Sequence, residues 1–441
     1  MKAQFLANLI VAIAEWLAKR SLRVQRLLNV IFERLYVSKW LNQPPAAHPR
    51  FTPEQMIART DTFNAASDRY FAEHEDLPFL LGKPYTDTEH FARRLFDMGV
   101  LAHWLRLAPG DVVMELGAGT CWLLHFLNRY GCPTIAVDVS PAALEMGREL
   151  FQRDPLVNWD LDPQFLPYDG HRIPLPDGHV DRIILYDAFH HIPNQEEILR
   201  EMARVLNDGG VVAMREPAAG HSRTEESRRE MDTWDVLEND IDVAELEPRA
   251  LACGFSRMTV VPIDLPLSIE VPASRLPDFL AGRELRHYWA LLATAMQSST
   301  YIVLYKGEYQ PTTRSPDNPR ARIEPAVEDV RVTAGEPLEL RVGLTNTGDT
   351  RWLSGAPDRR GATQLGAQLH HAAARAGIDA DWSRTPLPHD VAPGGQVTLN
   401  LVLPAIETPG EYRIVLDVIA EHVCWFGERG SPTAEVPLTV L

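Results

Sequence analysis

The period of the hydrophobic pattern changes along the chain, and these changes predict its domains. Between residues 111 and 216, short apolar runs alternate with amphipathic stretches of helical period, which predicts a parallel sheet with right-handed crossovers. Beyond residue 325, apolar and polar positions alternate with a period of two, in short runs bounded by turns; this predicts a β-sandwich. The expected fold class is therefore α/β with a C-terminal all-β sandwich.

Two further segments precede the α/β domain, and one connects it to the sandwich. Residues 1–45 are predicted to form a basic amphipathic helical segment that ends at Pro44-Pro45, and residues 46–110 are predicted to form a helical cap. Pro, Arg, Thr, Asn and Asp are frequent after Gly307, which is typical of a linker. The predicted domains are 1–45, 46–110, 111–308, the linker 309–324 and the sandwich 325–441.

The N-terminal segment, residues 1–41, carries an apolar helical face and an excess of Lys and Arg. Its apolar run, Phe5 to Ala18, is too short to span a bilayer and lacks a signal-peptide cleavage site. In a chain of net charge −17, a basic amphipathic helix suggests peripheral contact with an anionic membrane surface. Packing on the catalytic domain, or dimerisation, is the alternative, since apolar stripes at helical spacing are usually core.

The net charge and the cysteine content limit the kinds of binding partner and the cellular compartment that we expect. The net charge of −17 disfavours nucleic acid as a partner. The four cysteines are scattered, with no C-x-x-C pair, which is typical of reduced thiols in the cytosol. We therefore expect a cytoplasmic protein, and peripheral attachment to the inner face of the membrane stays open because of residues 1–41.

A strand, a glycine turn and a helix are predicted around Glu115, Gly117 and Gly119, and the next strand ends at Asp138. This arrangement brings a backbone against a nucleoside and offers a carboxylate to the ribose hydroxyls. A dinucleotide site needs a third glycine at position 122, where this chain has Trp122. The sequence therefore disfavours NAD and FAD.

These residues resemble motif I of the class I S-adenosylmethionine-dependent methyltransferases, of the type 11, UbiE-like kind. The segment Pro167 to Gly178, the fourth strand with Asp187 after it, and the turn Arg204 to Gly210 are similar to later motifs of that family. The resemblance covers residues 80–308 and departs from the family at Cys121-Trp122. It implies a Rossmann-like seven-stranded sheet with an antiparallel final hairpin, and S-adenosylmethionine as the cofactor.

The resemblance also implies roles for individual residues. Asp138 would bind both ribose hydroxyls, Glu115 would orient the loop and the methionine amino group, and Asp169 would bind the adenine amine. Taken singly, the glycines could be turns and Asp138 a capping carboxylate before Ser140-Pro141, but the joint spacing favours a cofactor site. The implied cofactor-binding set is Glu115, Gly117, Ala118, Gly119, Asp138, Val139, Asp169, Gly170 and Asp187.

Three histidines are candidates for a general base. Methyl transfer to a hydroxyl requires removal of a proton as the bond forms, and histidine suits that role. His190 and His191 follow the fourth strand and His221 follows the fifth, where ligands of open α/β sheets bind. The paired histidines could instead only shape the pocket. Together with Glu216 they are metal-ligating types, but neighbouring histidines rarely meet one ion, so no metal is expected.

The sandwich carries a resemblance of its own. Asn346 to Trp352 reads N-T-G-D-T-R-W and resembles the signature of immunoglobulin-like domains of the four-tryptophan type. Its aromatic residues could form a sugar-stacking platform, whereas core packing of a small β domain is the favoured alternative. The residues concerned are Trp352, Trp382, Trp425 and Phe426.

Three functions are consistent with the sequence. The first is O-methylation of a sugar, glycan or lipid-linked intermediate in a cell-envelope or polysaccharide pathway, since residues 1–41 and the sandwich suggest membrane and glycan contacts. The second is methylation of a small lipid or secondary metabolite. The third is a scaffold whose sandwich recruits a protein or glycan partner. The intact Gly117, Gly119, Asp138 and Asp169 argue against an empty pocket and hence against the scaffold.

Overall fold

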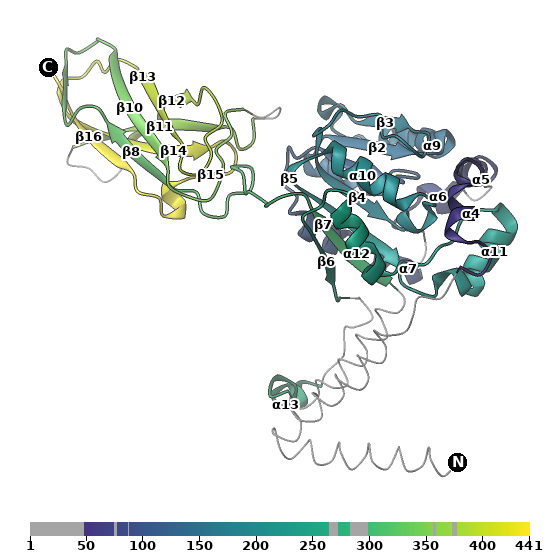
Figure 1. Cartoon of the computed structure of the whole chain (residues 1–441). Helices are drawn as coiled ribbons and strands as arrows, with labels where there is room; N and C mark the ends of the chain where they lie inside the picture. The colour runs from purple at the N-terminus through teal and green to yellow at the C-terminus, as the bar shows by residue number, and fades with distance from the viewer. Residues whose placement is uncertain are drawn as a thin grey trace.

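The structure is a computed structural model in which an α/β domain and a β-sandwich lie side by side (Figure 1). It describes residues 48–74, 77–86, 88–263, 272–282, 299–355, 359–372 and 377–441. The predicted helical segment 1–45, and with it the hypothesis of membrane contact through residues 1–41, lies outside the described residues. Among the helices that are described, none is long and apolar enough to cross a bilayer.

The α/β domain is built on a seven-stranded sheet with the order β3-β2-β1-β4-β5-β7-β6. Strand β7 is antiparallel to β5 and to β6, and the other neighbouring pairs are parallel. The predicted Rossmann-like sheet with its antiparallel final hairpin is therefore confirmed. The strands are β1 Val113–Leu116, β2 Thr134–Asp138, β3 Gln164–Pro167, β4 Val180–Tyr186, β5 Leu206–Pro217, β6 Arg257–Val261 and β7 Ser299–Tyr305.

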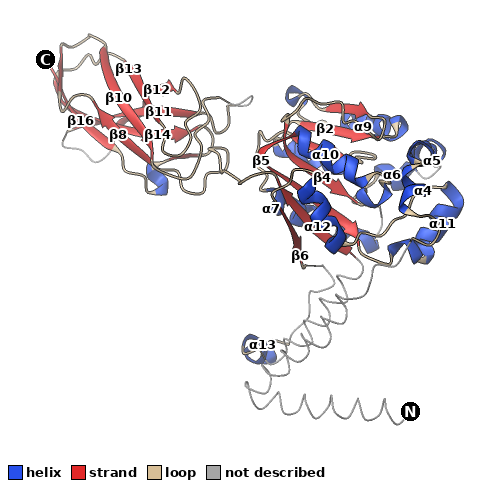
Figure 2. Cartoon of the chain, in the orientation of Figure 1, coloured by secondary structure: helices blue, strands red, loops and turns tan. Residues whose placement is uncertain are grey.

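Helices cover both faces of this sheet (Figure 2), which is why β1 and β2 read as continuous apolar runs. On one face α10 (Gln195–Val205) and α12 (Val243–Ala252) bury Ile198, Met202 and Leu246 against Met114 and Val212. The other face is covered by α7 (Thr88–Leu105), α8 (Trp122–Tyr130) and α9 (Pro141–Arg153). The remaining helices are α4 Pro53–Ile57, α5 Thr60–Glu73, α6 Leu77–Leu81, α11 Glu225–Trp234 and α13 Leu276–Leu280.

The C-terminal domain consists of two sheets, β13-β10-β8 and β12-β11-β14-β16-β9, with β15 paired to β14. Val342 and Leu401 from the first sheet and Leu365 and Ile414 from the second are buried in one shared core, so the predicted sandwich is present. Its strands are β8 Ala321–Pro325, β9 Val330–Val332, β10 Leu338–Asn346, β11 Thr363–His371, β12 Gly377–Pro386, β13 Gln396–Leu403, β14 Gly410–Ala420, β15 Cys424–Trp425 and β16 Ala434–Val440.

Two of the four aromatic residues proposed for a sugar-stacking platform on the sandwich, Trp352 and Phe426, lie in its core instead. Trp352 and Phe426 are both fully buried, and their rings pack edge to face with centroids 5.7 Å apart. Trp382 packs against the same core, and Trp425 lies over Gly366, where an added Cβ would come within 2.4 Å of the indole. The core-packing interpretation is therefore confirmed for Trp352 and Phe426.

The predicted linker 309–324 ends earlier than expected. Residues 321–324 belong to β8, which pairs with β10. Ala321 is buried while Arg322 and Glu324 point to solvent, so the period of two is present but short, and the charged residues beside Pro319 and Pro325 concealed it in the sequence.

The rest of the linker joins the two domains through an ion-pair cluster. The Arg314 guanidinium lies 3.4 Å from Asp111 and 3.8 Å from Asp181. Asp111 precedes β1 and Asp181 is near the start of β4, so this contact is at the amino ends of the strands. In Figure 1, α5 and α11 lie on the side of the α/β domain that faces away from the sandwich. The sandwich is thus attached opposite the carboxyl ends, where the candidate site lies.

Candidate active site

The glycine turn after β1 is packed too closely for any other residue. Gly117 has a φ of +71°, a conformation that L side chains rarely adopt. A Cβ on Gly117 would lie 2.5 Å from the Cβ of Ala188, in the turn after β4. Gly117 N and Ala118 N donate to Val137 O at 2.9 and 3.3 Å, which fixes the turn against β2.

We expect Gly117→Ala to destabilise the α/β domain by at least about 2 kcal/mol, from the left-handed φ and the contact with Ala188. Gly99→Ala is the matched control, because Gly99 lies exposed in α7 with no atom within 4 Å of its added Cβ. That change should stabilise the helix by up to about 1 kcal/mol. Denaturant unfolding of both variants compares the two; an equal effect on both would contradict the role of the turn.

Asp138 closes the same turn from the end of β2. Its two carboxylate oxygens accept N–H bonds from Gly119 and Ser140, each at 2.8 Å. Burial raises the pKa of Asp138, and the two amides partly offset that effect. Ser140 also caps α9, since its Oγ accepts from Ala143 N at 3.0 Å. The capping and cofactor interpretations of this segment are therefore compatible, because different side chains carry them.

Glu115, in β1, ends in a polar atom without a partner. Its Oε2 is buried and has no hydrogen bond among the described residues. Burial holds the pKa of Glu115 well above its usual range. An unsatisfied buried carboxyl beside two glycines of positive φ and a buried aspartate fits a bound group with a polar amino-acid moiety and a ribose. The residues present thus fit S-adenosylmethionine.

Helix α5 lies over this turn, and its contacts could not be read from the sequence. Ser140 Oγ donates to Asp68 Oδ1 at 2.8 Å, and Asn64 Nδ2 donates to Asp169 O at 3.1 Å. A Cβ on Gly119 would meet the Phe71 ring at 3.5 Å. Because these side chains lie three to four residues apart, they form one face of the helix, which covers the predicted cofactor residues.

The other predicted cofactor residues lie along the same edge of the sheet. Asp169 Oδ1 accepts from the backbone N–H groups of His171 and Arg172, both at 2.8 Å, and the Arg172 amide in particular lowers the pKa of Asp169. A Cβ on Gly170 would collide with the Asn64 side chain at 2.1 Å. Val139 is half-buried between Asp138 and Ser140. Asp169 thus has one carboxylate oxygen engaged within its own turn.

Asp187 is held by a buried ionic network. It has a φ of +50°, and its carboxylate pairs closely with Arg215 of β5. Arg215 Nε lies 3.7 Å from Asp97 of α7. Asp97 accepts bonds from the hydroxyl groups of Tyr186, at 2.8 Å, and of Tyr301. This network fixes the turn that carries Asp187 and the paired histidines.

The three predicted histidines are brought together with two glutamates. His190 Nδ1 lies 2.8 Å from Glu216 Oε2, and His221 Nε2 lies 2.6 Å from Glu238 Oε2. The His190 and His221 rings are 5.0 Å apart. His191 Nδ1 donates to Leu237 O at 2.6 Å. Glu238 is missing from the predicted site, because it lies in a polar segment, residues 235–242, that carries no motif.

Five residues form the histidine cluster: His190, His191, His221, Glu216 and Glu238. Burial and neighbouring charges shift the pKa values of four of them in different directions. Burial holds the pKa of His190 well below its ordinary value. Burial is the largest single effect on His221 and opposes its charging, but the bond to Glu238 together with the charges of Glu238, Asp187 and Asp240 raises its pKa. Burial and the Asp187 charge raise the pKa of Glu216 to about 7. Despite its burial, the surrounding histidines lower the pKa of Glu238 to about 2.

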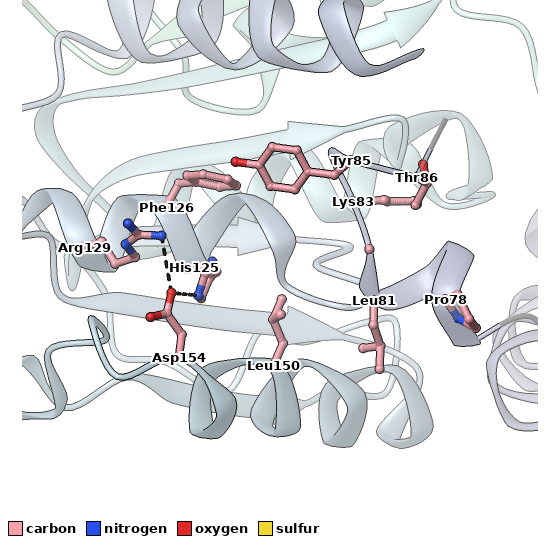
Figure 3. Close-up of a pocket in the computed structure, with 11 residues that line it drawn as sticks. Pro78, Leu81, Lys83, Tyr85, Thr86, His125, Phe126, Arg129, Leu150 and Asp154 are labelled. Atoms are coloured by element: carbon pink, nitrogen blue, oxygen red, sulfur yellow. Dashed lines mark hydrogen bonds and ion pairs between the residues drawn. The ribbon is translucent and has the colours of Figure 1, made fainter. Parts of the chain in front are cut away.

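A cavity of about 550 Å³ lies elsewhere, between α6, the following loop, α8 and α9. Figure 3 shows Asp154 on its floor in contact with His125 and Arg129. Lys83 lines the cavity, and its charge acts on Glu115 and Asp187. The lining contains none of the histidine cluster; it comprises Pro78, Leu81, Gly82, Lys83, Tyr85, Thr86, His125, Phe126, Arg129, Leu150 and Asp154.

Residues 114–214 match a family model described as a methyltransferase domain. Demethylmenaquinone methyltransferase of Tropheryma whipplei (strain Twist) is 30% identical over 116 residues, which is 25% of this chain and 46% of that protein. Sarcosine/dimethylglycine N-methyltransferase of Halorhodospira halochloris is 32% identical over 118 residues, 25% of this chain and 39% of that protein. The chain thus spans less than half the length of these curated relatives.

Among solved structures, the geranyl diphosphate C-methyltransferase of Streptomyces coelicolor A3(2) is 13% identical to this chain, with a TM-score of 0.39. The match covers 55% of this chain and 96% of that protein's chain. The matched family and the observed strand order define residues 114–214 as part of a methyltransferase domain of the class I fold. The cofactor of that class is S-adenosylmethionine, which agrees with the expectation from motif I.

Proposed function

We propose that the chain is an S-adenosylmethionine-dependent methyltransferase that acts on the hydroxyl group of a small molecule. The observation that carries the proposal is the buried Asp138 carboxylate, held by the amides of Gly119 and Ser140, with the histidine cluster at the neighbouring strand ends. Ligands of open α/β sheets bind at these carboxyl ends. The nucleoside of the cofactor and a histidine that accepts a proton would therefore lie close enough to take part in the same reaction.

Eight of the nine predicted cofactor residues have a direct role in this proposal, and the ninth, Asp187, is paired with Arg215. The backbone of Gly117, Ala118 and Gly119 would pass close to the cofactor, and Asp138 would accept its ribose hydroxyls. Glu115 would bind the methionine amino group, and Val139, Asp169 and Gly170 would surround the adenine. Bound S-adenosylmethionine supplies an activated methyl group, so the chain's own residues have to align the acceptor and receive its proton.

For the acceptor we propose a sugar or lipid-linked sugar, with a small lipid or secondary metabolite as the alternative. The basic N-terminal segment 1–41 supports a membrane-linked substrate. The sandwich offers its surface on the edge of the α/β domain opposite the site, which suits a partner or a polymer bound at a distance. The names of the curated relatives differ in their acceptors, a quinone precursor and an amine, so similarity alone leaves the acceptor open.

The test has two parts. Calorimetric titration of the whole chain with S-adenosylhomocysteine should give micromolar binding, about −8 kcal/mol. Labelled methyl transfer is then measured with lipid-linked sugars, free sugars, quinols and amines as acceptors. Transfer to amines alone, or to a ring carbon of the quinols, would overturn the hydroxyl proposal, and a folded chain that does not bind the ligand would overturn the enzyme.

A further inference from the structure

We infer that His221 and Glu238 form a catalytic pair, in which His221 takes the proton of the acceptor hydroxyl and Glu238 positions and stabilises it. The inference rests on the proposed function and selects one histidine among three. Glu238 is a residue that no motif indicated, and it would act through His221 as a positioning residue rather than on the substrate.

The hydrogen bonds assign the ring nitrogens of His221. Glu238 Oε2 lies 2.6 Å from His221 Nε2, and the Glu238 carboxylate can only accept at that distance. Nε2 therefore carries the proton, which leaves the lone pair on Nδ1. Within the described part of the chain, Nδ1 of His221 has no hydrogen-bond partner, and the side chain is 24% exposed. A histidine oriented by a buried carboxylate through one nitrogen acts as a base through the other.

His190 is excluded because its side chain is buried, with Nδ1 bonded to Glu216 and Nε2 facing the Glu238 carboxylate at 3.7 Å rather than open space. The Glu216 carboxylate accepts backbone N–H bonds from Ala188, Phe189 and His190 at 3.1, 2.8 and 3.2 Å. In addition to these three backbone donors, Glu216 accepts a hydrogen bond from Nδ1–H of His190 at 2.8 Å. The His190 side chain is 4% exposed, so it holds the turn in a neutral form.

Of the two adjacent histidines, His190 and His191, His191 is the more exposed. Its Nδ1 is committed to the Leu237 carbonyl at 2.6 Å, and its side chain is 43% exposed. Its ring packs on that of His190, and its distance to a carboxylate of the cluster is a longer one, 3.6 Å from Nδ1 to Glu238 Oε1. It therefore lacks the close carboxylate partner that orients His221.

Three members of the histidine cluster, His190, His221 and Glu238, offer ligand atoms within 4.8 Å of one another. A metal site is therefore the alternative to a catalytic pair. Two atoms bound to one tetrahedral Zn²⁺ at about 2.0–2.1 Å lie roughly 3.4 Å apart. The 2.6 Å between His221 Nε2 and Glu238 Oε2 is the length of a direct charge-assisted hydrogen bond. The geometry therefore favours a shared proton over a shared ion.

The step balances without a further reactant. The new C–O bond forms as the bond between sulfur and the methyl carbon breaks, and the hydroxyl proton passes to Nδ1 of His221. The imidazolium that results lies against the Glu238 carboxylate, and its proton then leaves to solvent. Methylation of a hydroxyl thus needs one base of suitable pKa, and the raised pKa of His221 brings it toward neutral pH.

The test compares His221→Gln with His179→Gln, an exposed histidine on the turn before β4. His221→Gln should lower kcat by about 10²–10⁴-fold, with binding of S-adenosylhomocysteine changed less than about threefold and partial rescue by added imidazole. His179→Gln should change neither. If kcat of His221→Gln stays within threefold of the parent while the ligand still binds, the pair is refuted although the methyltransferase stands.

A second readout does not depend on turnover. In the cofactor-free chain, the NMR titration of His221 should lie above its ordinary value, and Glu238→Gln should move it down. The charged and titratable groups that face His221 are Glu238, Asp187, Asp240 and His190. Of these, Glu238 bonds His221 Nε2 directly, and the uncharged Ser227 hydroxyl lies 3.2 Å from the same nitrogen. In Glu238→Gln, the apparent pKa on the acidic side of the pH profile of kcat/KM should fall by about as much as the pKa of His221 falls in the NMR titration. An unmoved titration, or activity that a chelator abolishes and a divalent metal restores, would overturn the inference.

Discussion

Asp138→Ala is expected to weaken binding of S-adenosylmethionine and S-adenosylhomocysteine on the order of 10²–10³-fold. Each oxygen of Asp138 already accepts one backbone N–H and has a lone pair left for a ribose hydroxyl. Hydrogen bonds to a charged group contribute about 1.5–3 kcal/mol each, and at the lower end of that range the loss of two corresponds to roughly 3–4 kcal/mol. Calorimetry on the parent and the variant measures this difference.

The substitution also leaves Gly119 N and Ser140 N without their acceptor, so the effect on the turn has to be separated from the effect on the ribose. An analogue of S-adenosylhomocysteine without the two ribose hydroxyls provides this separation. If Asp138 binds the ribose, the analogue should bind the parent and the variant with nearly equal affinity. A loss of the same size for both ligands would mean that Asp138 only holds the turn. The affinity of Asp138→Asn for S-adenosylhomocysteine should lie between those of the parent and Asp138→Ala, because the amide keeps one acceptor oxygen.

The sequence predicted the part of the site that depends on local chain geometry. Gly117, Gly119 and Asp138 are tied to strand ends and turns, and such positions recur at fixed spacing because a tight turn and a strand end demand particular residues. The end of β2 at Asp138 and the strands of the sandwich beyond residue 325 were likewise predicted, since their apolar residues stand in short runs bounded by turn residues.

What the sequence could not supply depends on contacts between distant segments. Glu238 meets His221 across 17 residues, and Asn64 and Asp68 reach turns more than 70 residues away. Neither pairing leaves a local pattern, because any polar segment can carry such residues. Strand β12, Gly377–Pro386, leaves no clear pattern for a related reason: it has few apolar residues, and its pairing with β11 defines it.

Asp97→Ala is expected to destabilise the α/β domain by about 3–5 kcal/mol, because it removes one member of a buried ionic network. Asp97 is completely buried and accepts from the hydroxyls of Tyr186 and Tyr301. Arg215, whose guanidinium side chain is 13% exposed, would be left with Asp187 as its ionic partner, and both tyrosine hydroxyls would lose their acceptor. Tyr301→Phe removes one hydrogen bond and should cost only about 1 kcal/mol.

Calorimetric unfolding is the suitable measurement, since the chain has two domains and a single transition cannot be assumed. The transition of the sandwich serves as an internal reference and should not move, because Asp97 lies in α7. If Asp97→Ala and Tyr301→Phe together destabilise less than the sum of the single changes, the two groups act as one unit. A loss below about 1 kcal/mol for Asp97→Ala would mean that water replaces the carboxylate, and that the turn with Asp187 is held from β5 alone.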